Sequence, residues 1–130
     1  MAKNYENLEV WQKAITFALL VYRLTKSFPR EELYGLTSQL RRSAISISSN
    51  IAEGAGRNSR KEFLRFVLIG LGSLNEAESQ IHVSYQLGYV KENEFQEMMQ
   101  RVGELGNLLG GLRNYLNKPH STSHFPQSKV

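Results

Sequence analysis

Four polar residues at helical spacing form the group in this chain that most resembles a catalytic constellation. They are Arg42, Ser46, Asn50 and Glu53, which follow one another at steps of three and four in residues 42–53. A helix would place all four on one side, and a hydroxyl beside a guanidinium and a carboxylate is the kind of group that catalysis uses. However, the chain has no aspartate, and its glycines match no phosphate-binding motif. We therefore interpret the four residues as a structural polar seam between helices or subunits, and we predict that the protein is not an enzyme.

Residues that could bind a metal or a cofactor are scarce. The chain has no cysteine, which excludes disulfides and thiolate metal sites. Of its three histidines, His82 lies in a segment with helical periodicity. His120 and His124 have a ligand-like spacing of four in a polar tail, but no acidic residue accompanies them there. We expect neither a metal nor a cofactor.

A group of cations surrounds the predicted start of a helix in the segment GRNSRKEFLR. It consists of Arg57, Arg60, Lys61 and Arg65, in a chain with a net charge of +4. Free backbone N–H groups at a helix N-terminus favour anions, whereas cations there are unfavourable for the helix itself. We therefore predict that this group binds the phosphate backbone of RNA or DNA. The alternative is a solvated turn that happens to be basic.

Hydrophobic periodicity places all these residues on or beside helices. Apolar residues recur at steps of three and four in four segments separated by turn-like residues. The stretch AISISS alternates like a strand, but the helical period from Leu36 to Ile51 holds over sixteen residues and favours a helix. The predicted helices cover about residues 7–27, 35–54, 59–87 and 92–117.

The ends and faces of these helices carry further signals. Ser59 followed by Glu62 is a capping-box signature, and Gly54 or Gly56 can end the preceding helix in the left-handed conformation. Glycines at 103, 106 and 110 predict close packing of the last helix, with a frayed or kinked helix as the alternative. A heptad seam in the third helix favours left-handed packing at about 20°. The seam consists of Phe63, Val67, Gly70, Leu74, Ala77, Ile81 and Ser84.

Four helices with short connections predict an all-α fold, an antiparallel up-down-up-down four-helix bundle. The predicted domain covers residues 1–118, and the polar, proline-bearing residues 119–130 are predicted to be disordered. The first and third helices each carry a second apolar stripe, which is more apolar surface than one small bundle can bury. Self-association is the simplest explanation.

The charges are unevenly distributed along such a bundle. The end that holds the 54–59 turn and both termini carries eight cations against four acids, whereas the other end carries six against seven. Because the fourth helix returns to the first end, Arg113 and Lys118 should flank the basic group. At 1.5 Å per residue Arg42 lies about 22 Å from the turn, level with Glu76 and Glu78. We predict one of these glutamates as its partner.

Several short motifs occur together in this chain, the most specific being NIAEG followed by a serine and a phenylalanine. The residues concerned are Trp11, Phe28, Pro29, Gln39, Arg42, Ser46, Asn50 to Gly54, Ser59, Phe63, Gly72 and Ser73. Over about residues 5–117 the chain thereby resembles a known bacterial family, the four-helix bundle proteins called 23S rRNA intervening-sequence proteins. The resemblance implies a homopentameric ring and no catalytic residues. A similar branch, the accessory variability proteins of diversity-generating retroelements, binds nucleic acid and a reverse transcriptase.

The same features set expectations for location and partners. No apolar run approaches the roughly 20 residues of a membrane span. Glu6 and Glu9 precede the first helix, where a signal peptide would carry basic residues. We expect a cytoplasmic protein without a membrane partner, whose partners are further copies of itself and RNA or DNA. The alternative is a structural or adaptor ring that binds another protein.

Overall fold

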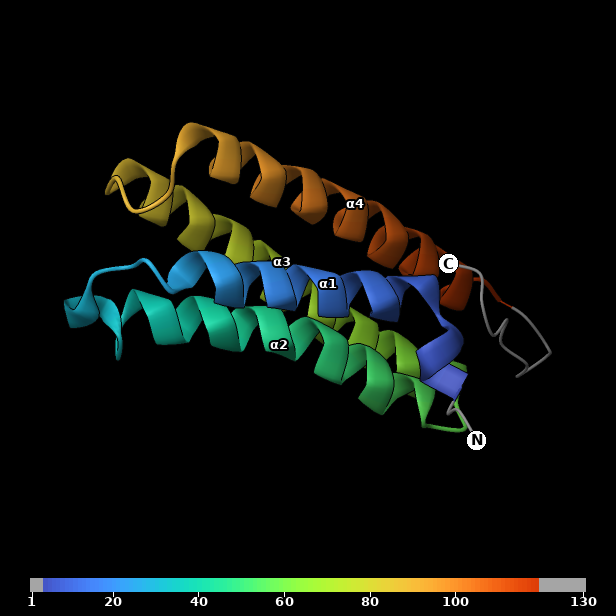
Figure 1. Ribbon diagram of the computed structural model, residues 1–130. Helices are drawn as coiled ribbons and strands as arrows, with labels where there is room; N and C mark the ends of the chain where they lie inside the picture. The colour runs from blue at the N-terminus through green and yellow to red at the C-terminus, as the bar shows by residue number, and fades with distance from the viewer. Residues whose placement is uncertain (1–3, 120–130) are drawn as a thin grey trace.

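The computed structural model describes residues 4–119 and contains only helices and their connections in that range (Figure 1). The all-α class predicted from periodicity is therefore confirmed. Two short 3-10 helices, η1 (Asn4–Asn7) and η2 (Arg30–Glu32), precede the first and second α-helix. Nearly all of the predicted disordered tail lies outside the described residues. The α-helices are α1 (Glu9–Thr25), α2 (Leu36–Ala55), α3 (Arg60–Gln86) and α4 (Glu92–Leu116).

Helices that follow one another in the sequence are neighbours in space. In the described part of the chain α1 packs on α2, α2 on α3, α3 on α4 and α4 on α1, whereas the backbones of diagonally placed helices stay further apart, with no Cα atoms within 8 Å of each other. Figure 1 shows the four helices side by side, with the α2–α3 turn at the end of the bundle that also holds both chain ends. This arrangement is the predicted up-down-up-down four-helix bundle.

One buried face on each helix builds the core. All seven residues of the predicted α3 seam are buried. On α2 the helical period also holds, because Leu40, Ala44, Ile47 and Ile51 are fully buried. The strand-like stretch AISISS therefore lies inside a helix, as predicted.

Two glycines have specific backbone roles, and neither is the predicted left-handed cap of α2. Gly56 follows α2 with φ −80°, and Gly54 lies inside the helix. A Cβ atom on Gly54 would lie 2.8 Å from Cβ of Phe66 and 2.9 Å from Cδ1 of Phe63, so the close approach of α2 and α3 requires glycine there. The positive φ among the described residues belongs to Gly88, at 82°, just after α3.

The glycines of α4 do not mark close packing within the chain, so that prediction is wrong. A Cβ atom on Gly103 would meet nothing within 4 Å, and one on Gly106 would lie 3.8 Å from Cδ2 of Leu74. The helix also continues without interruption from Glu92 to Leu116, so it is not frayed at these positions. At the start of α3, by contrast, the predicted cap is present, since Ser59 Oγ accepts a hydrogen bond from the Glu62 backbone N–H (3.1 Å).

Candidate nucleic-acid interface

The basic group predicted from the sequence lies where the start of α3 meets the end of α4. Arg60 Nη2 donates a hydrogen bond to the backbone carbonyl of Tyr115. The Arg60 guanidinium also lies 4.6 Å from the centre of the Tyr115 ring. The last turn of α4, which includes Arg113, is therefore brought to the basic group, as the antiparallel topology predicts.

Arg60 has a structural role that its position in the sequence does not reveal. The last carbonyl groups of a helix lack the donors that a further turn would supply, and the helix dipole attracts a cation there. In α4 the Tyr115 carbonyl accepts a long hydrogen bond from the Lys118 backbone N–H (3.4 Å). Arg60 is partly buried and satisfies one of these carbonyls from the neighbouring helix. The charge of Arg60 is therefore unfavourable for α3 but favourable for α4, and its guanidinium is occupied by the contact with Tyr115.

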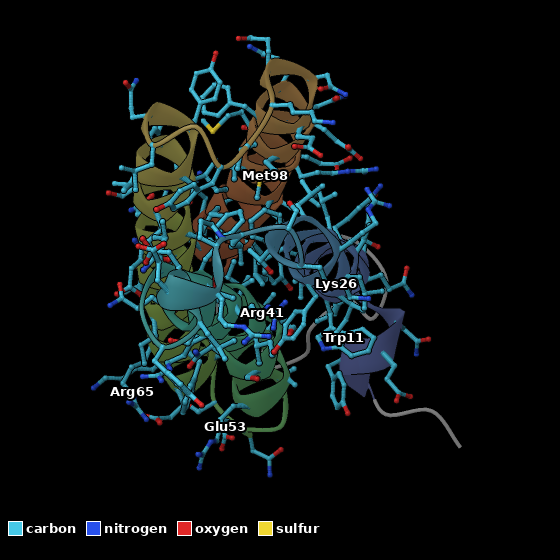
Figure 2. The ribbon with its side chains drawn as sticks, turned by 60° about the vertical axis from the view of Figure 1, so that its left-hand side comes forward. Trp11, Lys26, Arg41, Glu53, Arg65 and Met98 are labelled. Carbon is cyan, nitrogen blue, oxygen red and sulfur yellow. The ribbon has the colours of Figure 1, made fainter. Side chains whose placement is uncertain are left out.

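Arg57 and Arg65 both lie against the buried ring of Phe66. Their guanidinium carbons are 5.1 Å and 4.5 Å from the ring centre. Arg57 forms an ion pair with Glu53 (2.7 Å), and Arg65 forms one with Glu62 (3.1 Å). Both pairs are about half exposed to solvent, so each contributes only a few tenths of a kcal/mol. Figure 2 shows Arg65 and Glu53 at the same end of the bundle.

The other three predicted cations are exposed and have no carboxylate partner among residues 4–119. Lys61 forms no hydrogen bond or ion pair through its side chain in that range, and the same holds for Lys118. Arg113 Nε donates a long hydrogen bond (3.3 Å) to Asn114 Oδ1. The structure thus divides the six cations into three that are engaged and three that are available to an external anion.

The polar seam is real, but its composition differs from the prediction. Ser46 Oγ and Ser73 Oγ are 2.8 Å apart, across α2 and α3. Asn50 Nδ2 donates to the Ser46 backbone carbonyl (2.7 Å) and to Ser46 Oγ (3.0 Å). Two members of the predicted seam are therefore in place. Its partner on α3, Ser73, was one of the motif residues, but no pattern in the sequence pairs it with Ser46.

The two charged members of the predicted seam lie outside it. Arg42 is exposed, and no ion pair joins it to Glu76 or Glu78 within the described residues. Instead, Ser43 Oγ donates a hydrogen bond to Glu76 Oε1 (3.1 Å). The predicted level along the bundle is correct, but one residue along a helix is a rotation of 100°, so Ser43 and not Arg42 faces α3. Glu53 pairs with Arg57 at the turn.

Two tyrosine–glutamate hydrogen bonds connect elements at the opposite end of the bundle. Tyr89 donates to Glu32 Oε2 (2.9 Å), and this bond raises the pKa of Tyr89. Tyr85 donates to Glu92, which raises the pKa of Tyr85 and lowers the pKa of the Glu92 carboxyl. These bonds join η2 to the α3–α4 turn and the end of α3 to the start of α4.

Among residues 4–119 no three histidine, cysteine or acidic side chains gather closely enough to hold a metal ion. His82 packs edge-on against Phe95, with ring centres 5.3 Å apart. His120 and His124 lie outside the described residues. No helix in the described part of the chain is both long and apolar enough to cross a membrane.

Comparisons with known proteins agree with this bundle. The family model of the 23S rRNA-intervening sequence protein matches residues 6–111. The chain belongs to this family. A crystal structure of a protein of unknown function from the S23 ribosomal protein family of Bacteroides thetaiotaomicron is similar, with a TM-score of 0.72 and 23% identity. The similarity covers 80% of this chain and 97% of that one, and at this identity it supports the fold alone.

The match to the 23S rRNA-intervening sequence protein family confirms the resemblance seen in the motifs. No curated protein matches the chain. The family match includes the seam and the α2–α3 turn, whereas Arg113 and Lys118 lie beyond its end.

Proposed function

We propose that this member of the 23S rRNA-intervening sequence protein family is a non-enzymatic accessory protein that binds the phosphate backbone of RNA or DNA. The binding surface is the end of the bundle at the α2–α3 turn. The observation that carries the proposal is the presence there of three exposed cations without carboxylate partners, Lys61, Arg113 and Lys118. Exposed cations of this kind contact phosphate oxygens and release counterions when they do so.

The engaged arginines have a supporting role in this proposal. Arg57 and Arg65 are positioned by Phe66 and by half-exposed ion pairs, and such pairs are weak enough for a phosphate to compete with the carboxylates. Arg60 holds the end of α4 against the start of α3. It thereby joins the last turn of α4, which includes Arg113, to the first turn of α3, which includes Lys61, and acts as a positioning residue.

Binding of this kind is expected to be largely independent of base sequence. The two aromatic rings beside the cations, Phe66 and Tyr115, already carry arginine guanidinium groups. They offer no free platform for base stacking. The name of the family refers to intervening sequences of 23S rRNA, which makes RNA the first ligand to test.

We further propose that the protein forms a homopentameric ring in the cytoplasm. Large apolar side chains remain exposed on α3 and α2, including Leu68 (49%), Ile69 (42%), Val83 (47%) and Ile45 (42%). Such a surface favours self-association, while the number five rests on the family resemblance. Five copies of one weak phosphate-binding surface would act together and give avidity.

The same apolar side chains also favour the second candidate function, an adaptor ring that binds another protein. Two measurements distinguish the candidates. If nucleic-acid binding is correct, the purified protein shifts RNA or DNA in a salt-sensitive manner. If the protein shifts neither, and instead co-purifies with a protein partner after nuclease treatment, the adaptor function replaces the proposed one.

A further inference from the structure

A second cluster of cations lies at the other end of the bundle, where the charge distribution along the sequence does not predict one. A cavity of about 340 Å³ opens between the end of α1, η2 and the first turns of α2. Three of the lining residues are basic, none is acidic, and three are apolar. Figure 2 turns this end of the bundle forward and labels Lys26 and Arg41 there. The lining residues are Thr25, Lys26, Phe28, Pro29, Arg30, Leu33, Thr37 and Arg41.

Arg41 is held in place on one side of this cavity. Its Nε donates to Thr25 Oγ1 (2.8 Å), and its guanidinium lies 4.6 Å from the centre of the Tyr22 ring. A longer contact joins Nη2 to the Tyr22 backbone carbonyl (3.4 Å). No carboxylate pairs with Arg41 among the described residues. A positioned guanidinium with free N–H groups and no counterion is suited to binding an oxyanion.

Thr37 provides an independent indication of a ligand. Its side chain lines the cavity and the residue is only 4% exposed, yet its hydroxyl has no hydrogen-bond partner within residues 4–119. The hydroxyl oxygen is not one of the fully buried polar atoms, so it remains free to form a hydrogen bond with a ligand in the cavity. Thr37 also lies in the first turn of α2, where backbone N–H groups lack acceptors within the helix and the dipole favours an anion.

Neither acidic residue of η2 lines the cavity. Glu32 accepts hydrogen bonds from the Leu36 backbone N–H (3.2 Å) and from the Tyr89 hydroxyl (2.9 Å). Glu31 is exposed and forms no ion pair with the three cations in the part of the chain that the structure describes. The three cations therefore have no internal anion to neutralise them on this side of the bundle.

We propose that this cavity binds the phosphate group of a phosphate monoester. Arg41 and Thr37 would contact the phosphate oxygens, and Lys26 and Arg30 would neutralise the remaining charge. Three cations match the double negative charge of a phosphate monoester better than the single charge of a carboxylate. Phe28, Pro29 and Leu33 form an apolar wall, against which the body of the ligand packs.

The site lies at the opposite end of the bundle from the proposed nucleic-acid surface, so the two proposals stand or fall separately. Phenyl phosphate is a direct probe of the cavity, because it joins a phosphate group to an apolar ring. Inorganic phosphate and phenol, which each carry one of these two parts, are the comparison ligands. We expect saturable binding of phenyl phosphate by calorimetry, at least about tenfold tighter than binding of either half. In amide NMR spectra the shifts should centre on Thr37 and Thr25.

Variants test the assignment without disturbing the core. Lys26→Gln and Arg30→Gln remove exposed cations, and each should weaken phenyl phosphate binding about threefold. Thr37→Val removes the hydroxyl at nearly constant volume and should weaken it by about fivefold or more. Lys91→Gln is the matched control, since Lys91 is an exposed cation at the same end that does not line the cavity.

The outcomes are distinct. Loss of affinity in the three cavity variants, with wild-type affinity for Lys91→Gln, supports the site. Absence of saturable binding, equal weakening by Lys91→Gln, or NMR shifts centred on the α2–α3 turn would overturn it. Comparing AMP with a 5′-phosphorylated and a 5′-hydroxyl oligonucleotide then identifies the source. Tighter binding of AMP indicates a free nucleotide, and tighter binding of the 5′-phosphorylated strand than of AMP and the 5′-hydroxyl strand indicates a strand end.

Discussion

Arg60, in the first turn of α3, donates a hydrogen bond to the backbone carbonyl of Tyr115 in the last turn of α4 and lies 4.6 Å from the centre of its ring. The contact joins two helix ends that are far apart in the sequence. It also explains why a cation is found at a helix N-terminus, since the same charge is favourable at the C-terminus of α4. The proposed phosphate-binding surface depends on this junction for its shape.

The junction predicts different effects for two neighbouring cations. Arg60→Gln should lower the free energy of unfolding by about 1 kcal/mol or more, because a carbonyl in the last turn of α4 loses a charged donor. Lys61→Gln, the matched control, should leave stability unchanged or raise it by a few tenths of a kcal/mol, because it removes a cation from the first turn of α3. Urea unfolding measures both, and equal effects would show that the Arg60 contact contributes nothing.

Gly54 predicts a sharp steric effect at the crossing of α2 and α3. Gly54→Ala should destabilise the bundle by about 1–3 kcal/mol, because the added Cβ would lie 2.8 Å from Cβ of Phe66. Gly103→Ala is the control: its Cβ would meet nothing within 4 Å, and it should stabilise α4 by about 0.5–1 kcal/mol. Thermal unfolding of the two variants should therefore shift in opposite directions. A neutral Gly54→Ala would mean that α2 and α3 can separate without loss.

Arg42 predicts an effect on assembly that is separate from folding. Its side chain is exposed and unpaired among the described residues, so Arg42→Ala should leave the helix content of one chain unchanged. The sequence left open a seam between helices or between subunits; if Arg42 belongs to a seam between subunits, the variant should reduce the fraction of oligomer in native mass spectrometry. Lys91→Ala, a change of an exposed cation outside α2, serves as control. An intact oligomer in Arg42→Ala would remove Arg42 from the interface.

The tyrosine–glutamate bonds predict a loss of stability at alkaline pH. The hydrogen bonds to Glu32 and Glu92 raise the pKa of Tyr89 and Tyr85 above 10.0. Folding therefore favours the protonated phenols, so their contribution is complete below about pH 10 and is lost as pH rises through the raised values.

The double variant Tyr85→Phe/Tyr89→Phe should be less stable than the wild type at neutral pH and should lose less stability above about pH 10. Tyr34→Phe, whose side chain is 92% exposed, should retain the wild-type profile. Urea unfolding at a series of pH values measures the difference. Parallel profiles for the wild type and the double variant would contradict the assigned bonds.

The sequence predicted the framework of the bundle better than its contacts. Apolar periodicity identified all four helices and the whole α3 seam, because burial imposes that spacing directly. Gly54 was misinterpreted because a glycine near a helix end suits both a cap and a close helix crossing, and only the position of Phe66 distinguishes the two. For Arg42, the predicted height along α3 was correct, but the predicted partner was wrong. The neighbouring Ser43 faces α3 and bonds Glu76, whereas Arg42 points away.

The basic surface was predictable as a group and not in its details. Topology correctly brought Arg113 to the α2–α3 turn. The division of the six cations depends on contacts that have no signature in the sequence, such as the Tyr115 carbonyl that engages Arg60. The cavity beside Arg41 was not predicted either, since its three cations come from three elements, the end of α1, η2 and α2. In a sum of charges for this end of the bundle, the acidic residues there offset these cations.

The central claim is that exposed cations at the α2–α3 turn bind phosphate, and a salt series of RNA and DNA binding tests it most directly. The variant Lys61→Gln/Arg113→Gln/Lys118→Gln keeps Arg60, so the junction of α3 and α4 stays intact. The control Arg23→Gln/Lys91→Gln/Arg101→Gln makes the same change in net charge away from this surface. We predict that the first variant binds more weakly and that its slope of log affinity against log salt is lower by about 0.7 for each lost contact to single strands, whereas the control keeps the wild-type slope. Equal affinity and slope in the first variant and the wild type would contradict the claim.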